Sequence, residues 1–280
     1  MEDGYSILVP TDFSGAADKA LEAGINLARL SKAKLDVLHI EDVPADWVSI
    51  VENADRNLYL SINQRLDRIK DHLAERTQHV RDASVEVDDF LEFNKGHRAI
   101  LGHAENREND LIVMGAHGIG GIQGLMIGSY TRRILHSSHK PILVTKQADP
   151  PFWPKKMVFV SDFAEKHKNR FLVVIDFVQK MGLELHLLSI NTPMIFKGTA
   201  EMEERMGKYL ALAPEGFISK ASTYNHIHFE DALKEYCHKY DIDLVSMISY
   251  NKRHAWRVLG SSIQGIINHL NIPVLAIPER

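Results

Sequence analysis

Short apolar runs alternate with amphipathic stretches along the chain. In its first half, the apolar runs predict strands at residues 5–9, 35–40, 85–93, 110–114 and 141–146. Between them, apolar positions that recur every three or four residues predict helices at residues 14–28, 48–80, 96–105 and 129–135. Strands that alternate with helices in this way indicate a parallel α/β sheet with right-handed crossovers.

The same order of elements begins again in the second half of the sequence. Similar residues recur there in order: 157–163 repeat 7–13, 185–190 repeat 35–40, 243–245 repeat 110–112, 260–261 repeat 128–129, and 272–277 repeat 140–145. The offset is 150 for the first two pairs and 133 at Asp243, so the second half has lost 17 residues between these points. The loss should shorten the counterpart of the long helix at 48–80. Such an internal repeat predicts two copies of one fold.

A proline-rich stretch separates the two copies. It contains Pro150, Pro151 and Pro154, and because neither helices nor central strands tolerate proline well, it is expected to be a linker. The chain of 280 residues is long enough for two domains of ordinary size. We therefore predict two tandem doubly wound α/β domains, each with a five-stranded parallel sheet, at residues 1–147 and 156–280, with a linker at 148–155.

The segment most informative about chemistry is 110–146, in which a predicted strand leads into a glycine-rich loop. Six of the fourteen residues from 115 to 128 are glycine: Gly115, Gly118, Gly120, Gly121, Gly124 and Gly128. Glycine permits positive φ and lets backbone N–H groups approach an anion, and the helix expected near Ser129 adds the partial positive charge of its N-terminus. We interpret the segment as a phosphate-binding loop, with a loop that only turns the chain as the alternative.

Three segments reach the same edge of the predicted sheet. Ligands of such sheets bind beyond the carboxyl ends of the strands, near the point where the strand order reverses. Asp12, Ile40 and the loop at Gly115 all follow strands at that edge, so we expect them to converge on one crevice. The Asp12 carboxylate could accept hydrogen bonds from ribose hydroxyls or cap the helix near Ser14, and the two roles are compatible.

Hydroxyl and imidazole groups of the loop and the following helix could meet a phosphate. Ser129 and Thr131 offer hydroxyl donors, although Ser129 could equally be a plain N-cap. His117 could donate to phosphate oxygens or be solvated. The sequence order assembles no catalytic triad or carboxylate pair, so we assign no catalytic residue.

The spacing Gly115-x2-Gly118-x9-Gly128-Ser129, placed directly after a strand, resembles the nucleotide-binding pattern of universal stress proteins. Together with the repeat, the resemblance covers nearly the whole chain and implies a tandem universal stress protein with an adenine nucleotide alpha hydrolase-like fold. It also implies a site for ATP, ADP or AMP, with or without Mg2+. The residues that match the family's binding positions are Pro10, Thr11, Asp12, Ile40, Met114, Gly115, His117, Gly118, Gly128, Ser129, Tyr130 and Thr131.

The second copy departs from this pattern at the glycines. Ile248 and Asn251 stand where the first copy has Gly115 and Gly118, and the shorter loop that follows carries Trp256. A β-branched isoleucine adopts positive φ only at a steric cost, and the indole could fill the space of a nucleotide. We therefore predict one nucleotide per chain, held by the first domain.

Composition and charge restrict the remaining possibilities. The net charge of −4 and a pI near 6.4 give no electrostatic signal for nucleic acid or for an anionic membrane, and no apolar run is long enough to span a bilayer. We expect a cytoplasmic protein. The single cysteine, Cys237, excludes an intrachain disulfide. His226 and His228 lack an evident third ligand, so we expect surface histidines and no metal site.

The leading functional hypothesis is a stress-response regulatory protein that binds ATP or another adenine nucleotide. The alternative is a slow ATP hydrolase or a nucleotidyl- or phosphoryl-transfer enzyme, although the lack of a P-loop lysine argues against rapid phosphoryl transfer. Gln123 stands where a dinucleotide fingerprint requires glycine, which disfavours a flavin or nicotinamide protein. The strands at 142–146 and 274–277 are edge candidates. The family resemblance implies that they could pair within one chain, and that two chains could form a homodimer.

Overall fold

The computed structural model describes residues 4–43, 60–93, 96–117, 127–146, 149, 151–249 and 263–279. In the first half, the strands are β1 (Ser6–Thr11), β2 (Lys34–Glu41), β3 (Val87–Phe93), β4 (Leu111–Gly115) and β5 (Ile142–Thr145). The helices described there are α1 (Gly15–Ser31), α3 (Leu60–Asp82), α4 (His97–Asn106) and α5 (Ser129–Ser137). The part of the predicted long helix before residue 60 lies outside the described residues.

The second half repeats this order. Its strands are β6 (Lys156–Val160), β7 (Glu184–Asn191), β8 (Ile218–Asn225), β9 (Leu244–Ser249) and β10 (Val274–Pro278). Its described helices are α6 (Lys168–Met181), α7 (Thr199–Leu210), α8 (Phe229–Tyr240) and α10 (Ile263–His269), with a 3-10 turn at Glu165–His167 before α6. The helix α7 has 12 residues and α3 has 23, so the predicted shortening is confirmed.

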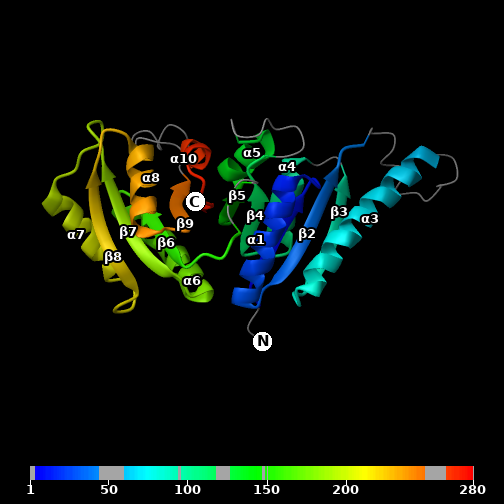
Figure 1. Cartoon of the computed structure of the whole chain (residues 1–280), viewed down its shortest axis with the longest axis horizontal. Helices are drawn as coiled ribbons and strands as arrows, with labels where there is room; N and C mark the ends of the chain where they lie inside the picture. The colour runs from blue at the N-terminus through cyan, green and yellow to red at the C-terminus, as the bar shows by residue number, and fades with distance from the viewer. Residues whose placement is uncertain are drawn as a thin grey trace.

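The strands form one ten-stranded sheet in the order β3-β2-β1-β4-β5-β10-β9-β6-β7-β8. All strand pairs within each half are parallel. Figure 1 shows the first half of the chain at the right and the second half at the left, related as two similar units side by side. The predicted fold class, a tandem pair of five-stranded parallel α/β sheets, is confirmed.

The repeat extends to individual hydrogen bonds. The backbone N–H of Ser6 donates to the carboxylate of Asp110 at 2.9 Å, and the N–H of Lys156 donates to the carboxylate of Asp243 at 3.0 Å. Each bond ties the start of a half's first strand to the residue just before its fourth strand. Both copies therefore fix the register of their central strands with the same contact.

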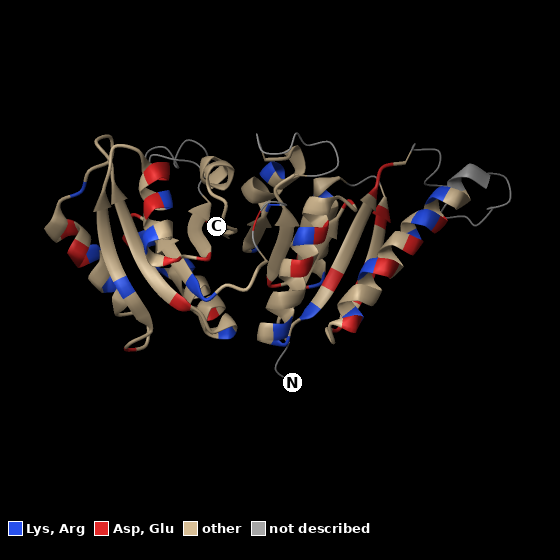
Figure 2. Cartoon of the chain, in the orientation of Figure 1, with Lys and Arg blue, Asp and Glu red and all other residues tan. Residues whose placement is uncertain are grey.

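The central strands are buried on both faces. Ile7, Leu8 and Val9 of β1 all have zero exposure, although successive side chains of a strand point to opposite faces. This explains why the central strands appear in the sequence as continuous apolar runs. The covering helices are amphipathic: α1 buries an apolar face, and Figure 2 shows basic and acidic residues interspersed along α1 and α3.

The two halves meet along a seam between β5 and β10, which pair antiparallel with Leu143 opposite Leu275. Side chains on both sides of the sheet add to this contact. The ammonium group of Lys180 in α6 lies 4.8 Å from the centre of the Tyr5 ring. The Ser249 hydroxyl at the end of β9 donates to the carbonyl of Leu135 in α5 at 3.0 Å.

Candidate functional site

A cavity of about 470 Å³ lies at the carboxyl ends of β1, β2 and β4. The residues that line it are Pro10, Thr11, Asp12, Ala17, Leu38, Ile40, Ile100, Met114, Gly115, His117, Gly128, Ser129, Tyr130 and Thr131. The structure thus brings together eleven of the twelve predicted site residues, and the twelfth, Gly118, lies outside the described residues. Their contact with a nucleotide stays a prediction. Ala17, Leu38 and Ile100 also line the cavity and were not expected there, because in the sequence they look like ordinary core positions of a helix or strand.

The turn between β1 and α1 carries two of these residues and is held by its own side chains. The Thr11 hydroxyl accepts a hydrogen bond from the N–H of Phe13 at 3.1 Å, and the Asp12 carboxylate accepts one from the N–H of Ser14 at 3.1 Å. The Ser14 hydroxyl in turn accepts from the N–H of Ala17 and is the helix cap. Asp12 therefore shapes the turn before the helix, and it also lines the cavity.

The structure corrects the reason given for Gly115. The two glycines of the loop that the structure describes, Gly115 and Gly128, do not have positive φ, and the φ of Gly128 is −57°. A Cβ atom at Gly115 would instead lie 2.8 Å from the carbonyl oxygen of Ala16 in the first turn of α1. Glycine is required there because the end of β4 and the start of α1 touch through their backbones.

The start of α5 forms another wall of the cavity. Gly128 is its N-cap, so the alternative of Ser129 as the capping residue is wrong, and Ser129 is the first helical residue, with an exposed side chain. The Thr131 hydroxyl donates to the carbonyl of Gly115 at 2.9 Å. Its proton is therefore committed to the end of β4, and only its oxygen is available to a ligand, as an acceptor.

Tyr130 closes the side of the cavity next to α4. Its hydroxyl would lie 3.5 Å from a Cβ atom at Gly96, a residue that has a φ of +52° just before that helix. Burial, followed by the nearby charge of Asp42, raises the pKa of Tyr130, which therefore stays a neutral phenol. His117 places its Nε2 atom in a buried position, without a hydrogen-bond partner among the described residues.

The second half repeats the turn that follows its first strand, but two cationic side chains, Lys197 and Arg205, lie against it. The Asp162 carboxylate accepts from the N–H of Ala164 at 3.2 Å, as Asp12 does from Ser14. The Lys197 ammonium lies 3.5 Å from this carboxylate, and Arg205 of α7 donates to the Asp162 carbonyl at 3.3 Å. Burial lowers the pKa of Lys197, although the charge of Asp162 opposes this shift.

The glycine replacements of the second half fall partly outside the described residues, which include neither Asn251 nor Trp256. Ile248 is buried inside β9 and does not adopt positive φ, so the backbone argument for this position is wrong. At the corresponding place in front of α6, Glu165 begins a 3-10 turn and the α-helix begins only at Lys168, whereas α1 begins at Gly15.

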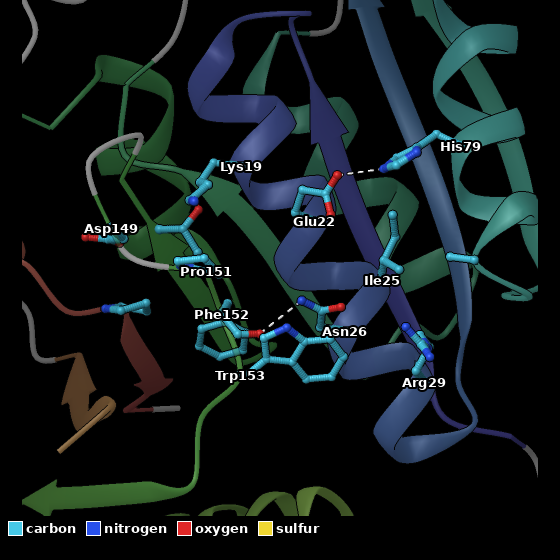
Figure 3. Close-up of a pocket in the computed structure, with 13 residues that line it drawn as sticks. Lys19, Glu22, Ile25, Asn26, Arg29, His79, Asp149, Pro151, Phe152 and Trp153 are labelled. Atoms are coloured by element: carbon cyan, nitrogen blue, oxygen red, sulfur yellow. Dashed lines mark hydrogen bonds and ion pairs between the residues drawn. The ribbon is translucent and has the colours of Figure 1, made fainter. Parts of the chain in front are cut away.

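A second cavity, of about 420 Å³, lies over α1 between the linker and the end of α3 (Figure 3). The Asn26 amide donates to the carbonyl of Phe152 at 3.1 Å, and the guanidinium of Arg29 lies 5.8 Å from the centre of the Trp153 ring. These contacts attach the linker to the outer face of α1. We interpret this cavity as part of the joint between the two halves.

The other candidate groups have structural roles in the described chain. The Nδ1 atom of His226 accepts from the N–H of His228 at 3.1 Å, so the pair shapes the entry to α8. The described residues contain no group of three histidine, cysteine or acidic side chains that could hold a metal ion. Burial raises the pKa of the Cys237 thiol to about 12, which makes it a poor nucleophile. No described helix is long and apolar enough to cross a membrane.

Comparison with known proteins shows the family to which this chain belongs. The universal stress protein family matches residues 5–146, which include every predicted site residue. The chain belongs to the universal stress protein family. A universal stress protein of Methanocaldococcus jannaschii is 28% identical over 153 residues, which cover 50% of this chain and 94% of that protein. One from Bacillus subtilis is 27% identical over 154 residues, covering 50% and 97%.

A solved structure shares the fold of the whole chain. The universal stress protein of Archaeoglobus fulgidus superimposes with a TM-score of 0.73 at 19% identity, over 99% of this chain and 100% of that one. The curated relatives thus correspond to one half of this chain, and the solved structure corresponds to both. A tandem arrangement of two universal stress protein units is consistent with both results.

Proposed function

We propose that this universal stress protein is a regulatory protein whose first half binds one adenine nucleotide. The observation that carries the proposal is the convergence of eleven residues, predicted from a nucleotide-binding pattern, on one cavity. The cavity volume, about 470 Å³, is within the range of small-molecule sites. Bound nucleotide would act by favouring one conformation or one partner over another.

The chemistry of the walls suits the three parts of a nucleotide. Leu38, Ile40 and Met114 offer an apolar wall for a base, and the Asp12 carboxylate offers an acceptor for ribose hydroxyls. The N–H groups at the start of α5 have no side-chain cap among the described residues, and they favour an anion such as phosphate. The close contact of Gly115 with α1 fits this use, because a side chain there would push α1 and the Asp12 turn away.

We propose that the second half binds no nucleotide. The Lys197 ammonium and the Arg205 guanidinium approach Asp162, whose counterpart Asp12 lines the first cavity. A ligand would have to displace these contacts, and it would separate the largely buried Asp162 carboxylate from the Lys197 ammonium. This support is independent of the glycine replacements noted in the sequence.

We further propose that residues 1–147 and 156–280 are two domains that remain paired in solution through β5 and β10, like the two subunits of a dimer. A further association of two chains and a cytoplasmic location are proposals of the same kind. ATP would enter with Mg2+ on its phosphates. Slow hydrolysis of bound ATP remains the second candidate function.

Isothermal titration calorimetry with AMP, ADP and Mg-ATP tests the main proposal. We expect saturation at one nucleotide per full-length chain, and release of phosphate no faster than in a protein-free control. Two equal sites per chain would overturn the asymmetry, and failure of all three nucleotides to bind at millimolar concentration would overturn the proposal. Rapid phosphate release would support the enzymatic alternative.

A further inference from the structure

We infer that Ser249, in the second half, is a positioning residue for the candidate site of the first half. Its hydroxyl donates to the carbonyl of Leu135 and so holds the C-terminal end of α5, the helix whose N-terminal end lines the cavity. The consequence for binding rests on the proposed nucleotide site. The structural part, that the second half holds α5 in place, is independent of any ligand.

The helix α5 depends on contacts with other segments. It has nine residues, fewer than the roughly 12–15 that an isolated helix needs to be stable in water. No side chain caps its start; instead, the N–H of Gly128 donates to the carbonyl of Ala116 at 2.7 Å. The Thr131 hydroxyl adds its bond to the carbonyl of Gly115. The N-terminal end of α5 is therefore attached to the end of β4.

The C-terminal end of α5 is attached to the other half of the chain. The last carbonyls of a helix have no partner within the helix. In α5, the carbonyl of Ile134 accepts from the N–H of Ser138 at 2.9 Å, and the next carbonyl, that of Leu135, accepts from the Ser249 hydroxyl at 3.0 Å. Ser249 is only 8% exposed, so water competes little for this bond.

The sheet fixes the position of Ser249. This residue is the last of β9 and pairs with Pro278 of β10, and β10 in turn pairs with β5 across the seam. A second contact reaches the same end of α5 from α10, because the Gln264 amide donates to Nε2 of the His136 ring at 2.8 Å. The second half thus holds α5 from the end opposite to the cavity.

A displacement of one end of α5 moves the other end, since the hydrogen-bonded helix is short and stiff. With a rise of 1.5 Å per residue, Leu135 lies about 9 Å along the axis from Ser129. Ser129 and Thr131 line the cavity, beside the N–H groups at which we propose that phosphate binds. The walls proposed for base and ribose lie on β2, β4 and the turn after β1. Loss of the Ser249 bond should therefore weaken the binding of phosphate and spare that of the nucleoside.

The first half does not return this bond. In the repeat, Ala116 takes the place of Ser249 at an offset of 133, and Ile267 takes the place of Leu135 at an offset of 132. Because alanine has no hydroxyl, α10 cannot receive from Ala116 the bond that α5 receives from Ser249. The contact gives the second half a part in the site of the first, although we propose that it binds no nucleotide itself.

Three substitutions on β9 test the inference. Ser249→Ala removes the donor, and Ser249→Thr keeps a hydroxyl on the same carbon. Ser246→Ala is the matched control, because Ser246 lies on the same strand with zero exposure and its hydroxyl has no hydrogen-bond partner among the described residues. Calorimetry with AMP and with adenosine compares two ligands that differ only in the phosphate.

We expect Ser249→Ala to bind AMP about fivefold more weakly than the wild-type protein, as expected for the loss of one hydrogen bond, and to bind adenosine equally well. Ser249→Thr and Ser246→Ala should keep the wild-type affinity for both ligands. Should Ser249→Ala fail to fold, Gln264→Ala removes the second contact at the same end of α5 and should lower the affinity for AMP alone, by about twofold.

Equal losses for AMP and adenosine in Ser249→Ala would overturn the inference, because a general loss of structure affects both ligands. A loss of the same size in Ser246→Ala, or unchanged AMP affinity in Ser249→Ala, would also overturn it. In Gln264→Ala, unchanged AMP affinity or an equal loss for both ligands would have the same meaning.

Amide hydrogen exchange of the full chain gives a readout that needs no ligand. The amides of α5 should exchange about fivefold faster in Ser249→Ala than in the wild-type protein, whereas the amides of α4 should keep their rates. If they do so and the wild-type protein binds neither AMP nor adenosine, only the proposed function fails. If the exchange of α5 is the same in both proteins, the inference fails.

Discussion

Gly115 at the end of β4 and Ala16 in the first turn of α1 are in backbone contact, since a Cβ atom on Gly115 would lie 2.8 Å from the Ala16 carbonyl oxygen. This contact sets how closely α1 approaches the sheet. It therefore sets the position of the Asp12 turn, which directly precedes α1. In the second half, where Ile248 replaces this glycine, the α-helix starts later.

We predict that Gly115→Ala lowers both stability and nucleotide affinity. The new methyl group meets backbone, which cannot rotate away, so the cost should be about 1–3 kcal/mol of unfolding free energy and at least a tenfold loss of affinity. Thermal unfolding and calorimetry measure the two effects. Gly102→Ala in α4 is the control, because nothing lies within 4 Å of its added Cβ and alanine favours a helix. Equal losses in both variants would contradict the steric explanation.

The asymmetry between the halves predicts different outcomes for two equivalent substitutions. Asp12→Asn should weaken nucleotide binding tenfold or more, because a hydrogen bond to a charged group contributes about 1.5–3 kcal/mol. Asp162→Asn should leave affinity and stoichiometry unchanged, because Lys197 and Arg205 already occupy the surroundings of Asp162. Calorimetric titration of both variants with nucleotide measures these two effects. A loss of binding in Asp162→Asn alone would reverse our assignment of the site.

Asp36 predicts a loss of stability in acid. Burial alone would raise the pKa of this carboxyl group, but hydrogen bonds from His103, Arg107 and Asn109 outweigh it and lower the pKa to about 2. A lowered pKa stabilises the folded state above the unfolded value near 4, and this stability is lost as the pH falls from about 4 to about 2.

We therefore expect Asp36→Asn to destabilise the protein by about 2 kcal/mol at pH 7, and by much less at pH 2. Denaturant unfolding at both pH values provides the measurement. Asp176→Asn is the control, since Asp176 forms an exposed ion pair with Lys180 on α6, and such pairs contribute little. An equal destabilisation by Asp36→Asn at both pH values would show that its charge is not the cause.

For Asp149 we predict the opposite effect of pH on stability, a loss as the pH rises. Burial raises the pKa of this carboxyl group despite the hydrogen bond from the Lys146 N–H and the charges of Lys146 and Lys19. A raised pKa in the folded state means that stability is lost as the pH rises above the unfolded value near 4. Asparagine keeps an oxygen for the Lys146 N–H and carries no charge. Asp149→Asn should therefore raise the melting temperature at pH 7 and have little effect at pH 3; a lower melting temperature at pH 7 would contradict this.

Much of the fold could be predicted because local pattern and burial agree. Both β1 and β4 contain unbroken apolar runs, which are typical of strands covered on both faces. The Ser14 cap of α1 is equally local, since its hydroxyl bonds the N–H of a residue three positions away. The positions at the strand ends followed from parallel topology, which brings the carboxyl ends of strands to one edge.

Other features of the site could not be predicted because they depend on contacts between distant segments. The role of Gly115 depends on how closely α1 passes, and the hydroxyl of Thr131 is directed to Gly115 by the position of α5. Sequence reasoning assigned both to phosphate. It also gave no role to His39, whose partner Thr11 meets it only once β1 and β2 are paired.

The sequence by itself determined that the chain contains two copies of one α/β fold, and which strand ends carry the candidate chemistry. Both follow from the local periodicity of apolar residues and from the order in which similar segments recur, and both can be read from the sequence alone. Only the tertiary structure decided how the same turn is supported in each half, by His39 and α3 in one and by Lys197, Arg205 and α7 in the other. The physical reason is that these supports are side-chain contacts between segments far apart in the chain, and their geometry exists only after the helices have packed on the sheet.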